Sequence, residues 1–328
     1  MAEIPDRNLG LDLARVTETA AMAAARWQGR GDKEAADKAA VDGMRAHLGT
    51  LDLNGIVVIG EGEKDEAPML HNGERVGNGD GQEVDIAVDP VEGTSLVASG
   101  MPGALAVLAV SERGTMFPPN SMVYMEKIAV GPEARDVIDL DAPVARNLAE
   151  VAKAKDSDVN DLTVIILDRP RNQPYIDAVR AAGARIRLIR DGDVSGAIAT
   201  GRAGTGIDML LGIGGSPEAV LAAAAMRCMG GEIQCRLWPR DDADRAYAAD
   251  NGYDLERVMG THDLVGGANV SFAATGITGG EFLSGVNFHG DGAVTHSVMM
   301  RSKTGSIRYM DAFHNLSKLG TLSSVEYG

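Results

Sequence analysis

The sequence predicts an α/β protein in which short buried strands alternate with amphipathic or alanine-rich helices. Three short runs of apolar residues in the second half, 162–167, 185–189 and 208–213, have the length and composition of buried strands. Each run is followed by a stretch with helical spacing of apolar residues, at 173–182, 194–199 and 217–229. This alternation is typical of βαβ units and predicts a largely parallel sheet.

The first half of the chain begins with two predicted helices. Residues 11–27 and 33–48 are alanine-rich, carry apolar residues at helical spacing, and are separated by the glycines at 29 and 31. Short apolar runs then predict four strands, at 55–60, 84–88, 104–110 and 127–130.

A polar stretch at 154–161 separates the two halves and places a boundary near residue 155. We therefore expect an N-terminal domain over 1–155 and a C-terminal domain over 156–328. After the three alternating units, further strands are predicted at 270–274, 296–300 and 306–310.

Composition excludes several classes of function. The 328 residues include 31 Lys and Arg against 47 Asp and Glu, which leaves a net charge of −16. Nucleic acids and anionic membranes both require a basic face, so neither is expected as a partner. Glycine is abundant at 41 residues, roughly 12 % against a usual value of about 7 %. The chain therefore needs many tight turns or close backbone approaches.

The sequence also predicts where the protein resides. Residues 1–6 have neither the basic region nor the apolar region of a signal peptide, and no apolar run approaches the length of a membrane span. The two cysteines, Cys228 and Cys235, match no zinc-ligand spacing and are expected to be reduced thiols. We expect a cytoplasmic protein.

The sharpest chemical signal is the segment from Asp89 to Ser95, which follows a predicted buried strand. Pro90 is expected to end the strand by removing a hydrogen-bond donor, so that Asp89 and Glu92 can face one point. Gly93 permits close approach of a ligand, and Thr94 begins a helix. Carboxylates beside a phosphate site suit Mg²⁺ or Mn²⁺. The alternative is a simple helix cap with acidic residues at its N-terminus.

Other acidic residues give weaker signals when each is taken alone. Glu61 lies in a glycine-flanked acidic loop after a strand, and Asp37 lies one helical turn after Lys33. Glu218 occupies the first turn of a helix. The alternatives are, respectively, a surface loop, a surface ion pair and complementation of the helix dipole.

Two further clusters suit a sugar phosphate. Arg169-Pro170-Arg171 follows a predicted strand, and two guanidinium forks around a rigid proline match a phosphate. The carboxylates of Asp191-Gly192-Asp193 can accept sugar hydroxyls. Both clusters have an alternative as capped strand-to-helix loops. Tyr124 could add a hydroxyl or be a half-buried aromatic. The sequence has no dinucleotide fingerprint, phosphate loop, Gly-x-Ser-x-Gly or histidine metal spacing.

Taken together, these motifs resemble a known family. They are Gly31-Asp32-Lys33 with Asp37, Ile59-Gly60-Glu61-Gly62-Glu63, Asp65-Glu66-Ala67-Pro68-Met69-Leu70, the run from Asp85 to Thr94, Arg169-Pro170-Arg171, Asp191-Gly192-Asp193 and Gly214-Gly215-Ser216-Pro217-Glu218. In this order they resemble the motifs of class II (GlpX-type) fructose-1,6-bisphosphatases, from about residue 16 to about residue 319.

The resemblance implies a layered αβαβα sandwich, the fold of the lithium-sensitive sugar and inositol phosphatases. It implies that Asp37 and Glu61 hold one divalent metal, Mg²⁺ or Mn²⁺, and that Asp89, Glu92 and Glu218 hold another. The N-terminal domain then carries most metal ligands and Thr94. Thr94 matches the residue that activates or positions the attacking group, and Lys33 and Asp65 match positions near the reaction centre. The positions that match substrate contacts are Glu92, Gly93, Thr94, Tyr124, Arg169, Pro170, Arg171, Asp191, Gly192, Asp193 and Gly215.

Two positions depart from the family pattern without touching a metal ligand. Arg169 stands where some members have Lys, and Ser95 stands where others have Thr, Arg or Asn. The first departure touches a substrate contact and bears on preference between sugars.

The expected activity is metal-dependent hydrolysis of the 1-phosphate of fructose 1,6-bisphosphate, in gluconeogenesis or carbon fixation. Thr94 would orient the attacking water or act as the nucleophile itself. The alternatives are a dual fructose/sedoheptulose bisphosphatase, an inositol-type monophosphatase and a non-catalytic metal and phosphate binder. The family also implies a homodimer or homotetramer.

Overall fold

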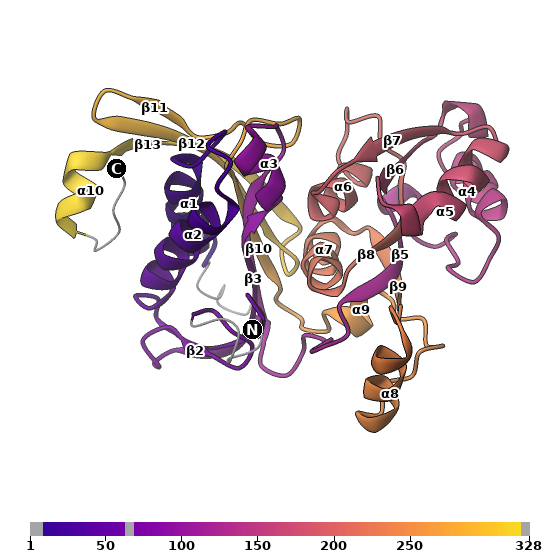
Figure 1. The fold of residues 1–328 in the computed structure, drawn as a ribbon, viewed down its shortest axis with the longest axis horizontal. Coiled ribbons are helices and arrows are strands. Elements are labelled where there is room, and N and C mark those ends of the chain that lie inside the picture. The colour runs from indigo at the N-terminus through magenta and orange to yellow at the C-terminus, as the bar shows by residue number, and fades with distance from the viewer. Residues whose placement is uncertain (1–8, 63–68, 323–328) are drawn as a thin grey trace, which may run out of the picture.

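The chain folds into two β-sheets with helices between them and on both outer sides (Figure 1). The computed structural model describes residues 9–62 and 69–322. The helices are α1 Gly10–Ala25, α2 Lys33–Leu48, α3 Thr94–Ser99, α4 Val144–Ala154, α5 Gln173–Ala181, α6 Asp193–Thr200, α7 Ser216–Met229, α8 Asp242–Asp250, α9 Thr261–Leu264 and α10 Leu316–Leu322, with 3₁₀ turns at Pro132–Ala134, Val159–Asp161 and Pro170–Asn172.

The strands divide between an eight-stranded and a five-stranded sheet. The larger sheet contains β1 Leu53–Ile59, β2 Arg75–Val76, β3 Gln82–Glu92, β4 Leu105–Glu112, β10 Ser271–Gly276, β11 Asn287–His289, β12 Gly292–Arg301 and β13 Ser306–Asn315. Its order is β11-β12-β10-β4-β3-β1-β2, with β13 paired to β12. The smaller sheet contains β5 Tyr124–Val130, β6 Thr163–Leu167, β7 Arg185–Ile189, β8 Met209–Gly215 and β9 Glu232–Leu237, in the order β7-β6-β8-β5-β9.

These elements form five layers, which confirms the αβαβα sandwich implied by the family resemblance. Helices α1 and α2 pack on the outer face of the larger sheet, and α4 and α5 pack on the outer face of the smaller one. Helices α6 and α7 lie between the sheets.

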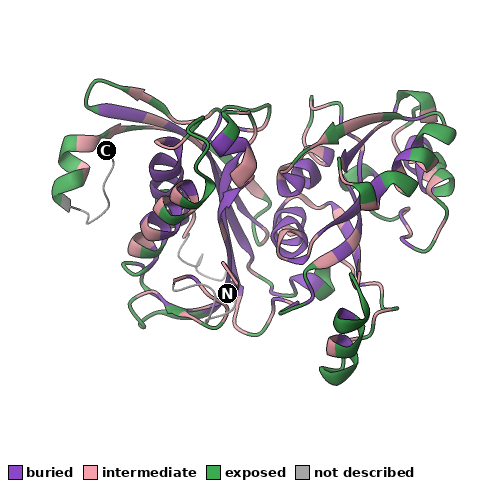
Figure 2. Ribbon diagram, in the orientation of Figure 1, coloured by how far each residue is buried: buried purple, intermediate pink, exposed green. Residues whose placement is uncertain are grey.

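Helix α7 illustrates why the sequence folds into layers. Its residues from Ala219 to Met226 are all buried, and Figure 2 shows the helix buried on nearly every side. A helix that is apolar all round must be covered on both faces, and its alanines let two sheets approach it closely.

The prediction of a largely parallel sheet was wrong. Among the described strands, β1–β3, β6–β7 and β6–β8 pair in parallel, and the other pairs are antiparallel. Connections such as residues 302–305 between β12 and β13 are too short for a parallel crossover. In addition, β5 from the first half inserts between β8 and β9 and pairs with both in antiparallel orientation.

The sheets partition the chain differently from the predicted boundary at residue 155. Strand β5 precedes that boundary but belongs to the smaller sheet, and strands β10 to β13 follow it but return to the larger sheet. The division into domains 1–155 and 156–328 stays a prediction.

The fold bears on two further expectations, one about the cysteine thiols and one about membrane-spanning segments. Cys228 and Cys235 are both buried and free of any disulfide. None of the described helices is long and apolar enough to cross a bilayer.

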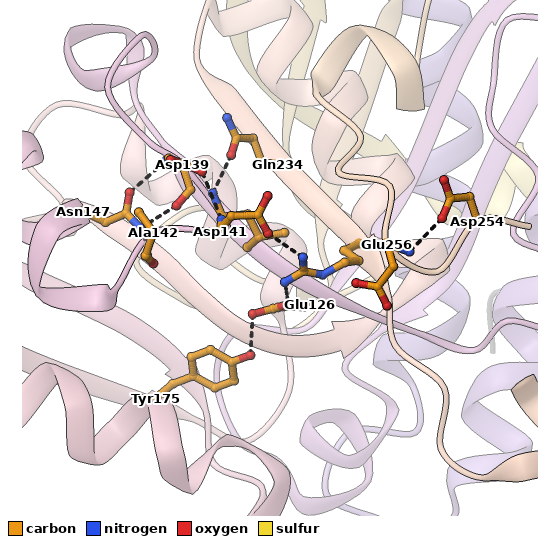
Figure 3. Close-up of polar contacts among 11 residues, drawn as sticks. Glu126, Asp139, Asp141, Ala142, Asn147, Tyr175, Gln234, Asp254 and Glu256 are labelled. Atoms are coloured by element: carbon orange, nitrogen blue, oxygen red, sulfur yellow. Dashed lines mark hydrogen bonds and ion pairs between the residues drawn. The ribbon is translucent and has the colours of Figure 1, made fainter.

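A polar network braces the outer side of the smaller sheet (Figure 3). Glu126 of β5 accepts a hydrogen bond from the Tyr175 hydroxyl of α5 at 2.7 Å, and its other oxygen pairs with Arg236 of β9 at 2.7 Å. Arg236 also pairs with Asp141 at 2.5 Å. These contacts fix β5, which carries Tyr124 and Lys127 toward the site described next.

Candidate active site

One pocket of about 1080 Å³ collects almost every residue that the sequence singled out. Its lining includes Lys33, Asp37, Glu61, Asp89, Glu92, Gly93, Thr94, Tyr124, Arg169, Arg171, Asp191, Gly192, Asp193, Gly215 and Glu218. Pro170 is not part of the lining, and Asp65 lies outside the described residues. The pocket is built from the ends of strands of both sheets and from the N-terminal turns of α2, α3, α6 and α7.

Asp37 and Glu61 form a carboxyl pair in the pocket lining. Asp37 projects from the second turn of α2, Glu61 follows β1, and each side chain affects the pKa of the other. Burial, followed by the neighbouring charge of Asp37, raises the pKa of Glu61 to about 8. Burial also raises the pKa of Asp37. Two carboxyls this close hold a proton between them unless a cation replaces it.

The backbone before Glu61 is held by a close approach that only glycine allows. A Cβ on Gly60 would lie 1.9 Å from the carbonyl oxygen of Leu70. The Glu61 amide donates to that same carbonyl at 3.0 Å, and the Gly60 amide donates to Asn72 Oδ1 at 3.1 Å. The loop geometry that aims Glu61 into the pocket therefore depends on the absence of a side chain at residue 60.

Asp89 and Glu92 lie within β3, not after it as predicted. The strand continues through Pro90 to Glu92, and its pairing with β4 shifts register between Asp89 and Glu92. Pro90 has no N–H to donate, so it removes a ladder bond and is accommodated by this irregularity without ending the strand. Both carboxylates still reach the pocket.

The environment of these two carboxylates strongly disfavours their negative charge. Burial raises the pKa of Asp89 well above its usual range, with Glu218 and Glu61 adding further repulsion. Burial and the charge of Asp193 do the same to the pKa of Glu92. Glu92 is 2 % exposed, and its Oε1 accepts from the Val194 amide at 2.9 Å. Its Oε2 has no hydrogen-bond partner among the described residues.

Glu218 reaches the same pocket from the first turn of α7. Its Oε2 is buried and, like that of Glu92, without a hydrogen-bond partner in residues 9–62 and 69–322. Burial and then the charge of Asp193 raise the pKa of Glu218. A Cβ on Gly215 would lie 1.8 Å from Glu218 Oε2, so any side chain at 215 would displace this carboxylate.

This donor set fits a hard divalent cation. Five carboxylates share one pocket, they raise one another's pKa, and two buried carboxylate oxygens lack partners. Oxygen donors of this kind suit Mg²⁺ or Mn²⁺. In the described part of the chain, no three His, Cys, Asp or Glu side chains are placed to hold one ion together. The carboxylates would therefore have to move closer to one another on binding a cation.

The pocket lining also carries guanidinium groups on rigid supports. Arg171 Nε donates to the Ile213 carbonyl at 3.1 Å, and its guanidinium lies 4.2 Å from the centre of the Tyr124 ring. Arg169 pairs with Asp191 at 2.8 Å, and Ser95 donates to the other oxygen of Asp191. Burial raises the pKa of Asp191, and the charges of Arg169 and Lys33 oppose that rise.

Thr94 is the first residue of α3 and follows Gly93, whose φ of +95° favours glycine. Its hydroxyl donates to the Val91 carbonyl at 3.3 Å, a long bond that leaves the oxygen able to accept. The threonine thus lies two residues after Glu92 in the chain and lines the same pocket.

The family model described as bacterial fructose-1,6-bisphosphatase, glpX-encoded, matches residues 7–314. The chain belongs to this family.

Curated relatives match the sequence of this chain over nearly their whole length. A Synechococcus sp. (strain JA-3-3Ab) protein is 43 % identical, with 94 % of this chain and 96 % of the relative covered. A Synechococcus elongatus protein is 41 % identical, with 97 % and 99 % covered. Both are named D-fructose 1,6-bisphosphatase class 2/sedoheptulose 1,7-bisphosphatase.

Within this GlpX-type chain, two charged residues of the site region were missed by sequence reasoning. Lys127 of β5 is 2 % exposed, and its Nζ lies 2.5 Å from Asp193 Oδ2. Burial opposes its charge, but Asp193 and Glu218 outweigh that effect and raise the pKa of Lys127. Arg240 lines the pocket from beyond the end of β9. A lysine inside an apolar strand was a usable signal for Lys127, whereas nothing in the local sequence marks Arg240.

Proposed function

We propose that this chain hydrolyses the 1-phosphate of fructose 1,6-bisphosphate, using Mg²⁺ or Mn²⁺, to give fructose 6-phosphate and phosphate. The observation that carries the proposal is one pocket lined both by five acidic side chains and by arginines beside a tyrosine. The family and the names of the relatives agree with a sugar bisphosphatase.

The five carboxylates of the pocket support the requirement for a divalent metal. Asp37 and Glu61 would hold one ion, and Asp89, Glu92 and Glu218 a second. A bound divalent ion would supply charge neutralisation at the phosphate and a more acidic water. Without a cation, the ionised forms of these buried carboxylates repel one another and the phosphate.

The chain's own groups account for the remaining tasks. Thr94 orients the attacking water through its hydroxyl, with Lys33 and Asp65 near the reaction centre as the family resemblance implies. Arg169, Arg171 and Tyr124 hold the phosphate that stays on the sugar, supported by their rigid hydrogen-bonded placement. Gly93, Gly192 and Gly215 give the substrate room, and Asp191 and Asp193 accept sugar hydroxyls.

A second substrate is favoured by the names of the relatives, which include sedoheptulose 1,7-bisphosphatase. A pocket of about 1080 Å³ leaves room for a sugar longer by one carbon. Side-by-side kcat/KM values for the two bisphosphates decide whether both are substrates.

The proposed oligomeric state rests on the resemblance to the family, and the proposed location rests on the sequence. We propose a homodimer or homotetramer in the cytoplasm. Sedimentation of the purified chain gives the oligomeric state directly.

The test of the main proposal is a phosphate-release assay on a panel of sugar phosphates. Excess chelator should abolish activity, and added Mg²⁺ or Mn²⁺ should restore it. Full turnover in excess chelator would contradict the metal requirement. No release from any substrate with any metal would leave a non-catalytic metal and phosphate binder as the correct description.

A further inference from the structure

Arg240 is a pocket-lining arginine that the proposed mechanism does not use. It lies three residues beyond the end of β9, and its side chain is 46 % exposed. Its Nε donates to Asp244 Oδ2 at 2.8 Å and its Nη2 donates to Asp244 Oδ1 at 2.8 Å. The Arg240 amide also donates to Asp244 Oδ2 at 2.8 Å. The guanidinium is therefore held by a two-pronged contact on one edge.

The partner that holds Arg240 lies behind it. Asp244, in the first turn of α8, has a side chain only 7 % exposed and does not line the pocket. Its hydrogen bond from Arg240 lowers the pKa of Asp244 to about 2, so this carboxylate stays charged at physiological pH. Arg240 Nη1, by contrast, donates to no other described residue in the hydrogen bonds of the structure. The free edge of a fixed guanidinium remains available to a ligand.

Arg240 and Arg171 approach Tyr124 from different segments of the chain: Arg240 follows β9, and Arg171 follows β6. Strand β9 pairs with β5, and the Trp238 amide donates to the Tyr124 carbonyl at 2.9 Å. The two aromatic rings meet edge to face with centres 6.2 Å apart. Arg171 stacks on the same tyrosine ring from the segment after β6. Tyr124 is also among the charge neighbours of Arg240.

The chemistry of a phosphate monoester explains why a second such group is useful. At neutral pH the ester carries nearly two negative charges and three acceptor oxygens. Arg171 uses its Nε on the Ile213 carbonyl, and Arg169 is paired with Asp191. A guanidinium already fixed by Asp244 can add charge-assisted hydrogen bonds with little loss of side-chain entropy.

We propose that Arg240 binds the phosphate that remains on the sugar, together with Arg171 and Tyr124, and so selects substrates that carry a second phosphate. This inference rests on the proposed function and adds a specificity-determining residue to it. Arg240 takes no part in the proton or phosphoryl transfer, so its removal should act on substrate binding far more than on kcat.

The test compares fructose 1,6-bisphosphate with fructose 1-phosphate, which lacks the second phosphate. In Arg240→Ala, KM for the bisphosphate should rise at least tenfold with kcat within about threefold of wild type. The ratio of kcat/KM for the bisphosphate to that for the monophosphate should fall by a similar factor. The inhibition constant for the product fructose 6-phosphate should rise in parallel.

Two further variants separate binding from structure. Arg240→Lys keeps the charge but loses the two-pronged contact, and it should recover part of the lost ratio. Arg245→Ala removes the same charge from an exposed site of α8 that does not line the pocket, and it should match wild type.

The outcomes distinguish this inference from the proposed function. An active Arg240→Ala enzyme with an unchanged substrate ratio and product inhibition overturns the role of Arg240. Equal losses on both substrates, accompanied by a lower Tm, also overturn it, because they indicate that Arg240 only anchors α8. A wild-type chain that releases phosphate from neither sugar overturns the proposed function itself.

Discussion

Thr94 is the residue on which the proposed chemistry depends most directly. It stands two residues after Glu92, at the start of α3, and among the described residues its hydroxyl makes a long bond to a backbone carbonyl. Thr94→Ala should lower kcat by roughly 100-fold or more, a range typical of a group that assists proton transfer. KM should stay within about threefold, since the phosphate-binding arginines are untouched. Steady-state kinetics with saturating Mg²⁺ measure both constants.

The matched control for Thr94 is on the same short helix. Ser99→Ala removes a hydroxyl from an exposed position of α3 and should leave kcat unchanged. If Thr94→Ala and Ser99→Ala have equal kcat, Thr94 has no role in orienting the attacking water.

Lys127 tests how the buried charges of the site depend on one another. It is the cation beside Asp193, at 2.5 Å, and Glu218 is another of its charge neighbours. Lys127→Met would leave Asp193 buried and unpaired, which typically costs about 3–5 kcal/mol of stability. The free energy of unfolding in urea measures this loss.

A double variant separates lost charge from lost packing at Lys127. Lys127→Met with Asp193→Asn removes both members of the pair, and it should regain at least half of the lost stability. A double variant that is no more stable than Lys127→Met alone would show that packing of the lysine stem dominates.

At the scale of elements, helices were predicted closely and strand pairing was not. The predicted helix at 33–48 coincides with α2, and that at 217–229 differs by one residue from α7. Both helices have apolar residues at helical spacing along their length, a pattern that can be recognised in the local sequence. Helices α4 and α8 were not predicted. The pairing of β5 between β8 and β9 depends on residues at least 79 positions apart, from Val130 to Met209, so no local pattern could reveal it.

The turn between β1 and Glu61 is an element whose geometry can be tested with one methyl group. Gly60→Ala would place a Cβ 1.9 Å from a backbone oxygen, which cannot rotate away as a side chain could. We expect a loss of stability of about 1–3 kcal/mol, as for other overpacked sites. The Mg²⁺ concentration for half-maximal activity should also rise, because the turn aims Glu61.

Gly320→Ala is the matched control for this turn, since a Cβ there meets nothing within 4 Å. It should not lower the unfolding free energy, since alanine favours a helix more than glycine does, and it should preserve the Mg²⁺ requirement. Wild-type values for both quantities in Gly60→Ala would mean that the Glu61 loop tolerates a shift of the backbone.

At the scale of the whole molecule, the resemblance to the family predicted the layers and most of the pocket. The residues that meet there come from α2, α3, α6 and α7 and from both sheets, and only a global match could bring Asp37 and Glu218 to one site. What escaped prediction is specific to three-dimensional packing. Arg240 reaches the pocket because β9 pairs with β5. The five carboxylates gathered in one cavity also explain part of the excess of Asp and Glu over Lys and Arg.

The stability of the whole fold also includes a buried acid remote from the pocket lining. Glu18 of α1 is 4 % exposed, and its Oε1 accepts from Ser297 of β12 at 3.5 Å. The Ser297 hydroxyl also contacts the Thr275 hydroxyl at 2.8 Å, and the Thr275 hydroxyl contacts that of Thr17 at 2.7 Å. Burial raises the pKa of Glu18 from 4.5 to about 7, against smaller opposing effects of Ser297 and Arg15.

The sign of the resulting pH dependence follows from this raised pKa. The folded state holds the Glu18 proton more tightly than the unfolded chain, so the contribution to stability is full below about pH 4.5 and is lost as the pH rises through about 7. Glu18→Gln mimics the protonated form. Its stability relative to wild type should therefore increase by up to roughly 3 kcal/mol between pH 4.5 and pH 8. Urea unfolding across this range, with the exposed Glu256→Gln as control, measures the change. A difference between Glu18→Gln and wild type that stays constant with pH would show that Glu18 ionises in the folded protein as it does in the unfolded chain.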